Sequence, residues 1–407
     1  MTPPAPTPMR FAEACSTADE TLEAADQASD RLREILGDGP IDLVLAFFNA
    51  RHVPAADELA ARLKERLAPV CLAGASGAAV ITSSHELESG PALTLFGARL
   101  PGVEVRPFIM ASSAWGEAMS DAVEFSRHTS GVDGAELVIV LSDPFTIDAD
   151  RVLRAFNQFA PGVRVVGGLM SAGPRPQANA VFLNDWVARE GGIGIALKGA
   201  LRVDVVVSQG CRPIGPPLTV TRADQNILIE LDGQPALERA EQVLRDLNDG
   251  EREMLKHGLY LGRPVRGEGV GRGDYLIRNL LGADRDQGVI AIADRAVERE
   301  RVRLHVRDAD SAVEDLELLL APQEFDSKAH GALLFTCNGR GRSFFGRPDR
   351  DISILQEALG GSIPVAGFYC AGEIGPVGER NHLHGQTASI AVLRPPSAPS
   401  RSATEPD

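Results

Sequence analysis

The 407-residue sequence has few cysteines, few aromatic residues and no long apolar run. Its five cysteines, at positions 15, 71, 211, 337 and 370, form no CxxC pair, which argues against a disulfide framework or a zinc ribbon. No run of about 18 apolar residues could span a membrane. The start, "MTPPAPTPMR", also lacks the apolar segment of a signal peptide. We therefore expect a cytoplasmic protein with reduced thiols.

Basic charge is scarce as well. Lys and Arg number 41 against 56 Asp and Glu, which gives a net charge of -15. Nucleic acids and anionic membranes bind proteins largely through basic side chains, so neither is expected as a partner. The proline- and serine-rich ends of the chain have the composition of disordered tails.

What the sequence does contain is one pattern that occurs three times. An apolar strand is followed by an amphipathic helix, a second apolar strand, a glycine-rich turn and a further strand. The first strands read "IDLVLAFFN", "AELVIVLSDP" and "GALLFTCNG", and the helices "AADELAARLKERLA", "DADRVLRAFNQFAPG" and "DRDISILQEALGG". A short strand–helix–strand crossover predicts a parallel strand pair. The fold class expected is therefore α/β (or α+β), with repeated strand–helix–strand units and mixed sheets in two domains.

The remaining segments suggest where the domains divide. Residues 1–37 are expected to be a disordered tail followed by one amphipathic helix, "FAEACSTADETLEAADQASDRLREIL". The segment "LRVDVVVSQG" is expected to pair with "GIGIALKG" through a short turn. A break near the turn at Asp232 and Gly233 then separates a domain at 38–234 from one at 235–394, with a disordered tail at 395–407.

The most unusual side chains follow the strands of the third unit. "CNGRGRSFFG" comes after its first strand and "GFYCAGEIGP" after its second. Loops at the carboxyl ends of parallel strands lie on one edge of a sheet, where ligands commonly bind. Cys337 and Cys370 should therefore lie on the same side of this unit.

No catalytic constellation accompanies these loops. The GxSxG and GxxxxGK[ST] motifs are absent, and His382 and His384 have no carboxylate cluster that would complete a metal site. Cys337 is the strongest nucleophile candidate, because Arg340 and Arg342 would lower its pKa if they were close. No base stands near it in sequence, and a small buried residue at a strand end is the equally weighted alternative. We expect no catalytic residue, no metal and no cofactor.

Several further motifs give the chain a family resemblance. They are "GCRPIGPPLTVT", "NILIELDGQPAL", "DYLIRNLLG", "GVIAIAD", "VRLHVRDA", "CNGRGRSFFG", "GFYCAGEIGPVG" and "HGQTASIAVL". In this order they resemble the FIST sensory module, from about Asp38 to Leu393, with the FIST N-terminal domain at 38–234 and the FIST-C domain at 235–394. The resemblance implies a sensor of small ligands, with amino acids or their derivatives as the ligand class.

The predicted ligand site combines that resemblance with the unusual loops. Arg340 or Arg342 would grip a carboxylate bidentately while Glu373 receives an amine, which together would suit an amino-acid-like zwitterion. The full set of expected ligand-binding residues is Cys337, Asn338, Gly339, Arg340, Gly341, Arg342, Cys370, Gly372, Glu373, Ile374, Gly375 and Pro376.

The leading hypothesis is thus an intracellular small-ligand sensor, not an enzyme, with no output domain of its own. Its output would pass through a separate signalling protein or through oligomerisation. Two alternatives stay open. One is an enzyme in which Cys337 attacks an acyl or carbonyl substrate, and the other is a non-enzymatic interaction scaffold.

Overall fold

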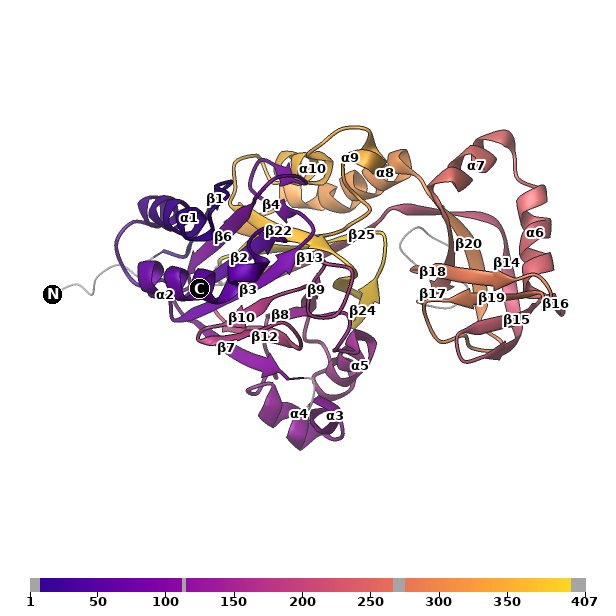
Figure 1. Cartoon of the computed structure of the whole chain (residues 1–407), viewed down its shortest axis with the longest axis horizontal. Helices are drawn as coiled ribbons and strands as arrows, with labels where there is room; N and C mark the ends of the chain where they lie inside the picture. The colour runs from indigo at the N-terminus through magenta and orange to yellow at the C-terminus, as the bar shows by residue number, and fades with distance from the viewer. Residues whose placement is uncertain (1–7, 112–114, 266–274, 397–407) are drawn as a thin grey trace, which may run out of the picture.

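The computed structural model describes residues 8–111, 115–265 and 275–396, arranged as four β-sheets with helices on their outer faces. Figure 1 shows a large body and a smaller lobe beside it. Three six-stranded sheets make the body, and one seven-stranded sheet makes the smaller lobe, which we call the insert lobe. No helix in the described part of the chain has the length and apolar character needed to cross a membrane. The mixed sheets and helices confirm the expected α/β class.

The three sheets of the body share one core order of four strands. In each, two parallel strands joined by a helix lie beside an antiparallel strand and then an outer strand. The first unit has β1 (Arg10–Ser16), β6 (Leu93–Arg99), β2 (Leu43–Asn49) and β3 (Cys71–Gly77). The second has β7 (Val103–Met110), β12 (Gly192–Gly199), β8 (Leu137–Ser142) and β9 (Val165–Leu169). The third has β13 (Arg202–Gln209), β25 (Thr387–Arg394), β21 (Gly331–Cys337) and β22 (Val365–Cys370).

Each sheet is completed by a hairpin from a different unit. The hairpins are β4 (Val80–Ile81) with β5 (Glu86–Leu87), β10 (Val181–Leu183) with β11 (Trp186–Ala188), and β23 (Glu373–Val377) with β24 (Arg380–His384). Strand β4 of the first unit pairs with β22 of the third, and β10 of the second unit pairs with β3 of the first. Strand β23 of the third unit pairs with β9 of the second. The exchange interlocks the three units, because none of the sheets is complete without a neighbour.

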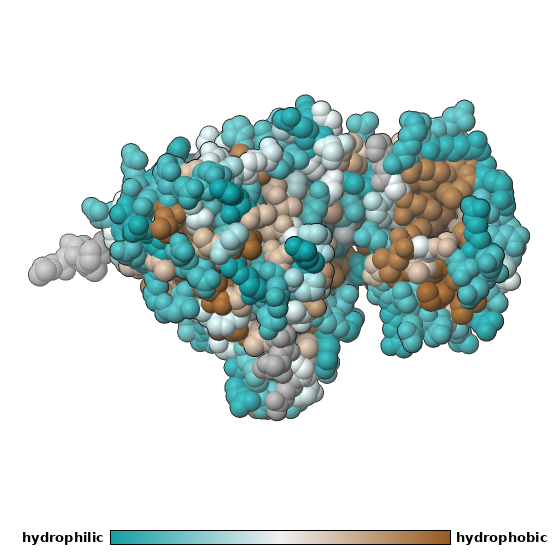
Figure 2. All heavy atoms as spheres, viewed as in Figure 1, coloured by the Kyte–Doolittle hydropathy of each residue, from teal (hydrophilic) through white to brown (hydrophobic). Residues whose placement is uncertain are grey.

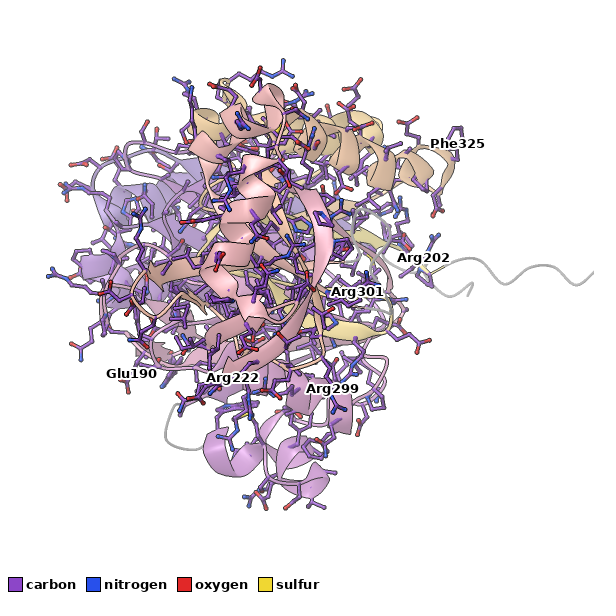
Figure 3. All side chains as sticks on the ribbon, turned by 90° about the vertical axis from the view of Figure 1, so that its right-hand side faces the viewer. Glu190, Arg202, Arg222, Arg299, Arg301 and Phe325 are labelled. Atoms are coloured by element: carbon purple, nitrogen blue, oxygen red, sulfur yellow. The ribbon has the colours of Figure 1, made fainter. Side chains whose placement is uncertain are left out.

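The inner faces of the three sheets meet in one apolar core. Phe47 of the first sheet stacks on Phe368 of the third, with ring centroids 5.4 Å apart, and Phe335 meets both rings edge-on. Helices cover the outer faces. They are α1 (Thr21–Leu36) and α2 (Ala56–Leu67), then α3 (Trp115–Ala118), α4 (Ala122–His128) and α5 (Ala149–Phe159), and finally α8 (Ala309–Leu320), α9 (Arg342–Phe345) and α10 (Arg350–Ala358). Short 3-10 turns lie at η1 (Val53–Ala55) and η3 (Ala321–Phe325), and Phe325 projects from the latter (Figure 3).

The insert lobe interrupts the third unit between β13 and α8. Its strand β14 (Cys211–Asp224) pairs with both β20 (Arg301–Arg307) and β15 (Ile227–Leu231), which closes the sheet into a small barrel. Figure 3 looks onto this lobe and shows Arg222, Arg299 and Arg301 on it. Figure 2 shows apolar residues gathered between β20 and two helices of the lobe. Its other elements are β16 (Gln234–Pro235), α6 (Ala236–Arg245), α7 (Asp249–Met254), η2 (Leu255–His257), β17 (Leu259–Pro264), β18 (Tyr275–Asp284) and β19 (Val289–Ile292).

Two sequence expectations need correction here. Residues 11–36 are not one helix, because Arg10–Ser16 forms β1, paired in register with β6, before α1 begins. The expected hairpin of 192–199 with 201–210 is wrong, since β12 pairs with β7 and β8 whereas β13 pairs with β25. In both cases long-range pairing overrides a locally reasonable interpretation.

The division at 234/235 stays a prediction. It lies within β16 of the insert lobe, whose strands run from β14 to β20.

Candidate functional site

The two strands that carry the predicted site end side by side. β21 and β22 are parallel, and Cys337 and Cys370, their last residues, are register partners. The loops that follow leave from the same edge of the third sheet. Asn338 and Ala371 are exposed there, while Cys337 is 8% exposed and Cys370 fully buried.

Glu373, the first residue of β23, is completely buried. Its Oε2 accepts hydrogen bonds from the backbone N–H (3.1 Å) and the hydroxyl (2.7 Å) of Thr387. Its Oε1 is buried with no partner among the described residues. Burial raises the pKa of this carboxyl to about 8, although the Thr387 bonds and the charge of Arg340 oppose the rise. A carboxyl with one open oxygen and a pKa near neutrality can donate a hydrogen bond when protonated and accept one when ionised.

Arg340 is also completely buried, but most of its guanidinium is already paired. Its Nε and Nη2 each donate to a carboxylate oxygen of Asp351 at 2.8 Å, and Thr336 donates to the same carboxylate at 2.7 Å. Only Nη1 is left buried and unpartnered within the described ranges. The bidentate grip predicted for a ligand carboxylate is therefore made with Asp351 instead. Arg342, the other predicted anchor, is exposed at the start of α9.

Cys337 is held as a neutral thiol. Burial, and next the charge of Glu373, raise its pKa to about 12. The backbone N–H groups of Gly339 and Gln386 and the charge of Arg307 oppose this only in part. The Gly339 N–H lies 3.4 Å from the sulfur. Since the thiolate is the reactive form of cysteine, this environment disfavours a nucleophilic role.

Two residues outside the predicted set complete the cluster. Arg307, at the end of β20 in the insert lobe, donates from Nη2 to the carbonyl of Gly339, and its guanidinium lies 4.0 Å from the centre of the Phe344 ring. Its Nε is buried and unpartnered among the described residues, as is Oε1 of Gln386. Both residues belong to motifs of the family resemblance, "VRLHVRDA" and "HGQTASIAVL", but nothing local in those motifs marks them as site residues.

Glycines allow these groups to come together. A Cβ on Gly339 would lie 3.0 Å from both Nη atoms of Arg307 and from Oε1 of Gln386. A Cβ on Gly210 would lie 2.9 Å from Nη1 of Arg340. Side chains at these two positions would therefore displace the polar groups that surround Cys337.

The other predicted residues have structural contacts. With its amide turned so that the nitrogen faces the neighbouring oxygens, Asn338 donates to the carbonyl of Tyr369 (3.2 Å) and to the Ser171 hydroxyl (3.3 Å). Gly372 accepts from the backbone of Leu169 at 2.8 Å. Gly341 precedes α9 as its N-cap, while Ile374, Gly375 and Pro376 continue β23, with Ile374 fully buried.

Metal binding finds no support here. Within residues 8–111, 115–265 and 275–396, no three His, Cys, Asp or Glu side chains form a group that could hold a metal ion. His382 and His384 lie in β24, and burial lowers their pKa values to about 4 and about 3.

We term the group of Cys337, Gly339, Arg340, Glu373, Gln386 and Arg307 the Glu373 site. It presents four buried polar atoms without partners in the described structure: two acceptors, on Glu373 and Gln386, and two donors, on Arg340 and Arg307. Arg307 comes from the insert lobe and the others from the body. Buried polar groups without partners are costly and rare, so a hydrogen-bond partner at these four atoms would stabilise the structure.

The chain matches two family models and is similar to several mycobacterial proteins. Residues 42–234 match the family model of the FIST N domain, and residues 236–376 match that of the FIST C domain. "Uncharacterized protein Rv0628c" of Mycobacterium tuberculosis (strain ATCC 25618 / H37Rv) is 38% identical over 389 residues, which is 95% of this chain and 100% of the relative. "Uncharacterized protein Mb0898c" of Mycobacterium bovis is 38% identical over 383 residues, 93% of this chain and 97% of the relative.

Among solved structures, a cyanuric acid hydrolase from A. caulinodans aligns over 96% of this chain and 99% of its own. The sequence identity is 7% and the TM-score 0.39. A second cyanuric acid hydrolase structure has 11% identity and a TM-score of 0.34, over 95% and 99% of the two chains.

Proposed function

This chain belongs to the FIST family through both its N and its C domain, and we propose that it is a sensory protein that binds a small polar ligand at the Glu373 site. FIST domains are associated with sensory signalling. The observation that carries the proposal is the set of four unpartnered buried polar atoms around Cys337. A ligand that offers both donors and acceptors would satisfy all four.

The chemistry of these atoms favours an amino acid or an amino-acid derivative. An ammonium would bind Oε1 of Glu373 as that carboxyl gives up its proton to solvent, and an ammonium or amide N–H would donate to Oε1 of Gln386. A carboxylate or carbonyl would accept from Nε of Arg307 and Nη1 of Arg340. In this assignment Arg307 takes over the main role that the sequence suggested for Arg340 and Arg342, since Arg340 is largely committed to Asp351.

The position of the site suggests how binding would produce a signal. Arg307 lies in the insert lobe, whereas Glu373 and Gln386 lie in the body, so a ligand bound by all three would connect the two parts. A ligand can shift a conformational equilibrium only by binding one arrangement better than another. In this proposal the protein works in the cytoplasm, and a separate signalling protein reads the arrangement of the lobes.

The thiol-enzyme alternative receives less support from the geometry. A nucleophilic Cys337 needs a lowered pKa and a neighbouring base, but burial and the charge of Glu373 raise its pKa to about 12. A binding role needs neither feature.

A thermal-shift experiment on the full chain tests the proposed function. Free amino acids, amino-acid amides, N-acetylated amino acids and small carboxylates would be screened at neutral pH. A ligand at 100 times its dissociation constant stabilises the folded state by about 2.7 kcal/mol, which is readily detected. Glu373→Gln should abolish or strongly reduce the response, whereas Glu379→Gln, an exposed carboxyl in the β23–β24 turn, should leave it unchanged. Unshifted melting curves across the library, or equal responses of both variants, would count against the proposal.

A further inference from the structure

A polar cavity lies where the insert lobe meets the second unit of the body. Its volume is about 250 Å³, and none of the residues of the Glu373 site lines it. Helix α5 and strand β24 form one wall, and β17, β18 and the segments around them form the other. Because ligand pockets for drug-sized molecules measure roughly 300–1,000 Å³, this cavity suits a small ion or metabolite.

Two of the arginines that line the cavity are fixed by carboxylates of the insert lobe. Arg263 donates to Glu300 at 2.9 Å and to Asp294 at 2.5 Å. Arg278 donates from Nε to Asp294 at 2.6 Å and from Nη1 to the carbonyl of Leu383 in β24 at 3.0 Å. These four charged groups therefore neutralise one another and join the lobe to the body.

The other two arginines of the lining have no such partners. Arg154 of α5 and Arg380 of β24 are exposed, and their side chains make no hydrogen bond or ion pair with another described residue. His382 also lines the cavity, and its Nε2 is buried and unpartnered within the described chain. Burial lowers the pKa of His382 to about 4, so the ring is neutral at pH 7 and can donate one N–H.

Most of the negative charge in the described lining is already paired with arginine. Asp294 and Glu300 are paired, which leaves Asp150 as the carboxylate of the lining without an ion pair to another described residue. Among the described lining residues, two guanidinium groups and one carboxylate are thus without an ion pair. The cavity is locally cationic in a chain whose net charge is -15.

We propose that this cavity binds a small oxyanion of the phosphate type, free or as a monoester, through Arg154, Arg380 and His382. Arginine is the side chain best suited to phosphate, because its planar fork donates two parallel hydrogen bonds. The anion would contact α5 and β24 on the body while it lies against Arg263 and Arg278 of the insert lobe. The site is independent of the Glu373 site and of the ligand proposed there.

Titration calorimetry at constant ionic strength tests this site on the full chain. Inorganic phosphate and glycerol phosphate are the two probes, and tighter binding of the ester would indicate that its organic part contacts the lining. Arg154→Gln and Arg380→Gln should each weaken binding at least about ten-fold, because each removes a charge-assisted hydrogen bond. Both arginines are exposed, so these variants should fold normally.

Two further variants make the test specific. Asp150→Asn removes the unpaired carboxylate and should tighten phosphate binding, whereas Arg347→Gln, an exposed arginine near α9, should leave it unchanged. The site would be refuted if neither probe bound saturably, or if the Arg154→Gln/Arg380→Gln double variant bound as well as the unmodified chain. Weaker binding by Asp150→Asn would also refute it.

Discussion

Arg340 and Asp351 form a bidentate ion pair in which neither side chain is exposed to solvent. Both N–O distances are 2.8 Å, and the pair ties the loop after β21 to the first turn of α10. The hydroxyl of Thr336, in β21 itself, donates to the same carboxylate. Arg340, the first arginine of "CNGRGR", thus fixes the loop on which the Glu373 site is built.

The stability of the chain should depend strongly on this pair. Asp351→Asn leaves a buried guanidinium without a charged partner, and we expect a loss of about 3–5 kcal/mol in the free energy of unfolding. Arg350→Gln, which removes an ion pair with the exposed side chain of Glu317, should cost less than about 1 kcal/mol. Urea unfolding measures both. A loss for Asp351→Asn no larger than that for Arg350→Gln would contradict the assignment.

The thiol of Cys337 should react slowly. Because its pKa is raised to about 12, we expect native protein at pH 7.4 to be alkylated by iodoacetamide at Cys337 much more slowly than free cysteine. Cys15, which is half-buried, should be modified before it. Peptide mapping by mass spectrometry gives the order of labelling, and unfolded protein provides the control in which both react freely. Preferential labelling of Cys337 in the native state would contradict this prediction and support the alternative in which Cys337 is a catalytic nucleophile.

The buried carboxyl of Glu373 should make the stability depend on pH. Below its ordinary pKa of 4.5 both the folded and the unfolded chain carry the proton. Between 4.5 and about 8 the unfolded chain loses the proton while the folded chain retains it, so the free energy of unfolding falls as pH rises. The contribution is up to about 1.4 kcal/mol per pH unit.

Glu373→Gln should remove that contribution. The difference in unfolding free energy between variant and unmodified chain should change across pH 4.5–8 and level off above it. Taking the difference cancels the opposite contributions of His382 and His384, whose pKa values are lowered. Glu379→Gln serves as the matched exposed control. A difference that is constant with pH would show that Glu373 is ionised normally in the folded state.

The insert lobe should be removable. The backbone N–H of Asp308 donates to the carbonyl of Gly210 at 3.3 Å, so the chain enters and leaves the lobe at neighbouring points. Replacing residues 211–307 with two glycines should therefore leave a folded body, as measured by circular dichroism and a cooperative melt. The shortened chain should lose the amino-acid response of the Glu373 site, because it lacks Arg307. A molten, non-cooperative product would show that the body depends on the lobe.

Local patterns in the sequence were sufficient to predict the repeated units. The apolar runs that become β2, β8 and β21 and the amphipathic segments that become α2, α5 and α10 were each recognisable from their own residues. The position of Cys337 and Cys370 at one edge of the sheet was also predictable, because parallel neighbouring strands end at the same edge.

The exchange of hairpins between units was not predictable. Strands β4, β10 and β23 have only two to five residues, and their partners lie far away in the chain.

The candidate site was predictable only in outline. Glu373 among glycines suggested a carboxyl at a strand end, and the structure places it there. Arg340 was assigned to a ligand because Asp351 lies eleven positions away, with nothing in the sequence to indicate that the two would pair. Arg307 could not have been found from its neighbours, since it reaches the site only through the closure of the insert lobe onto the body.

The exchanged hairpins also set an order in which the body can be finished during synthesis. β9 has no partner on its β23 side until β23 and β24 have left the ribosome. The second sheet is therefore completed only after almost the whole chain has been synthesised. Premature termination after β22 would thus damage a sheet whose other strands were made much earlier. Long-range closure of this kind folds slowly, and the nascent chain exposes the open edge of β9 throughout that interval.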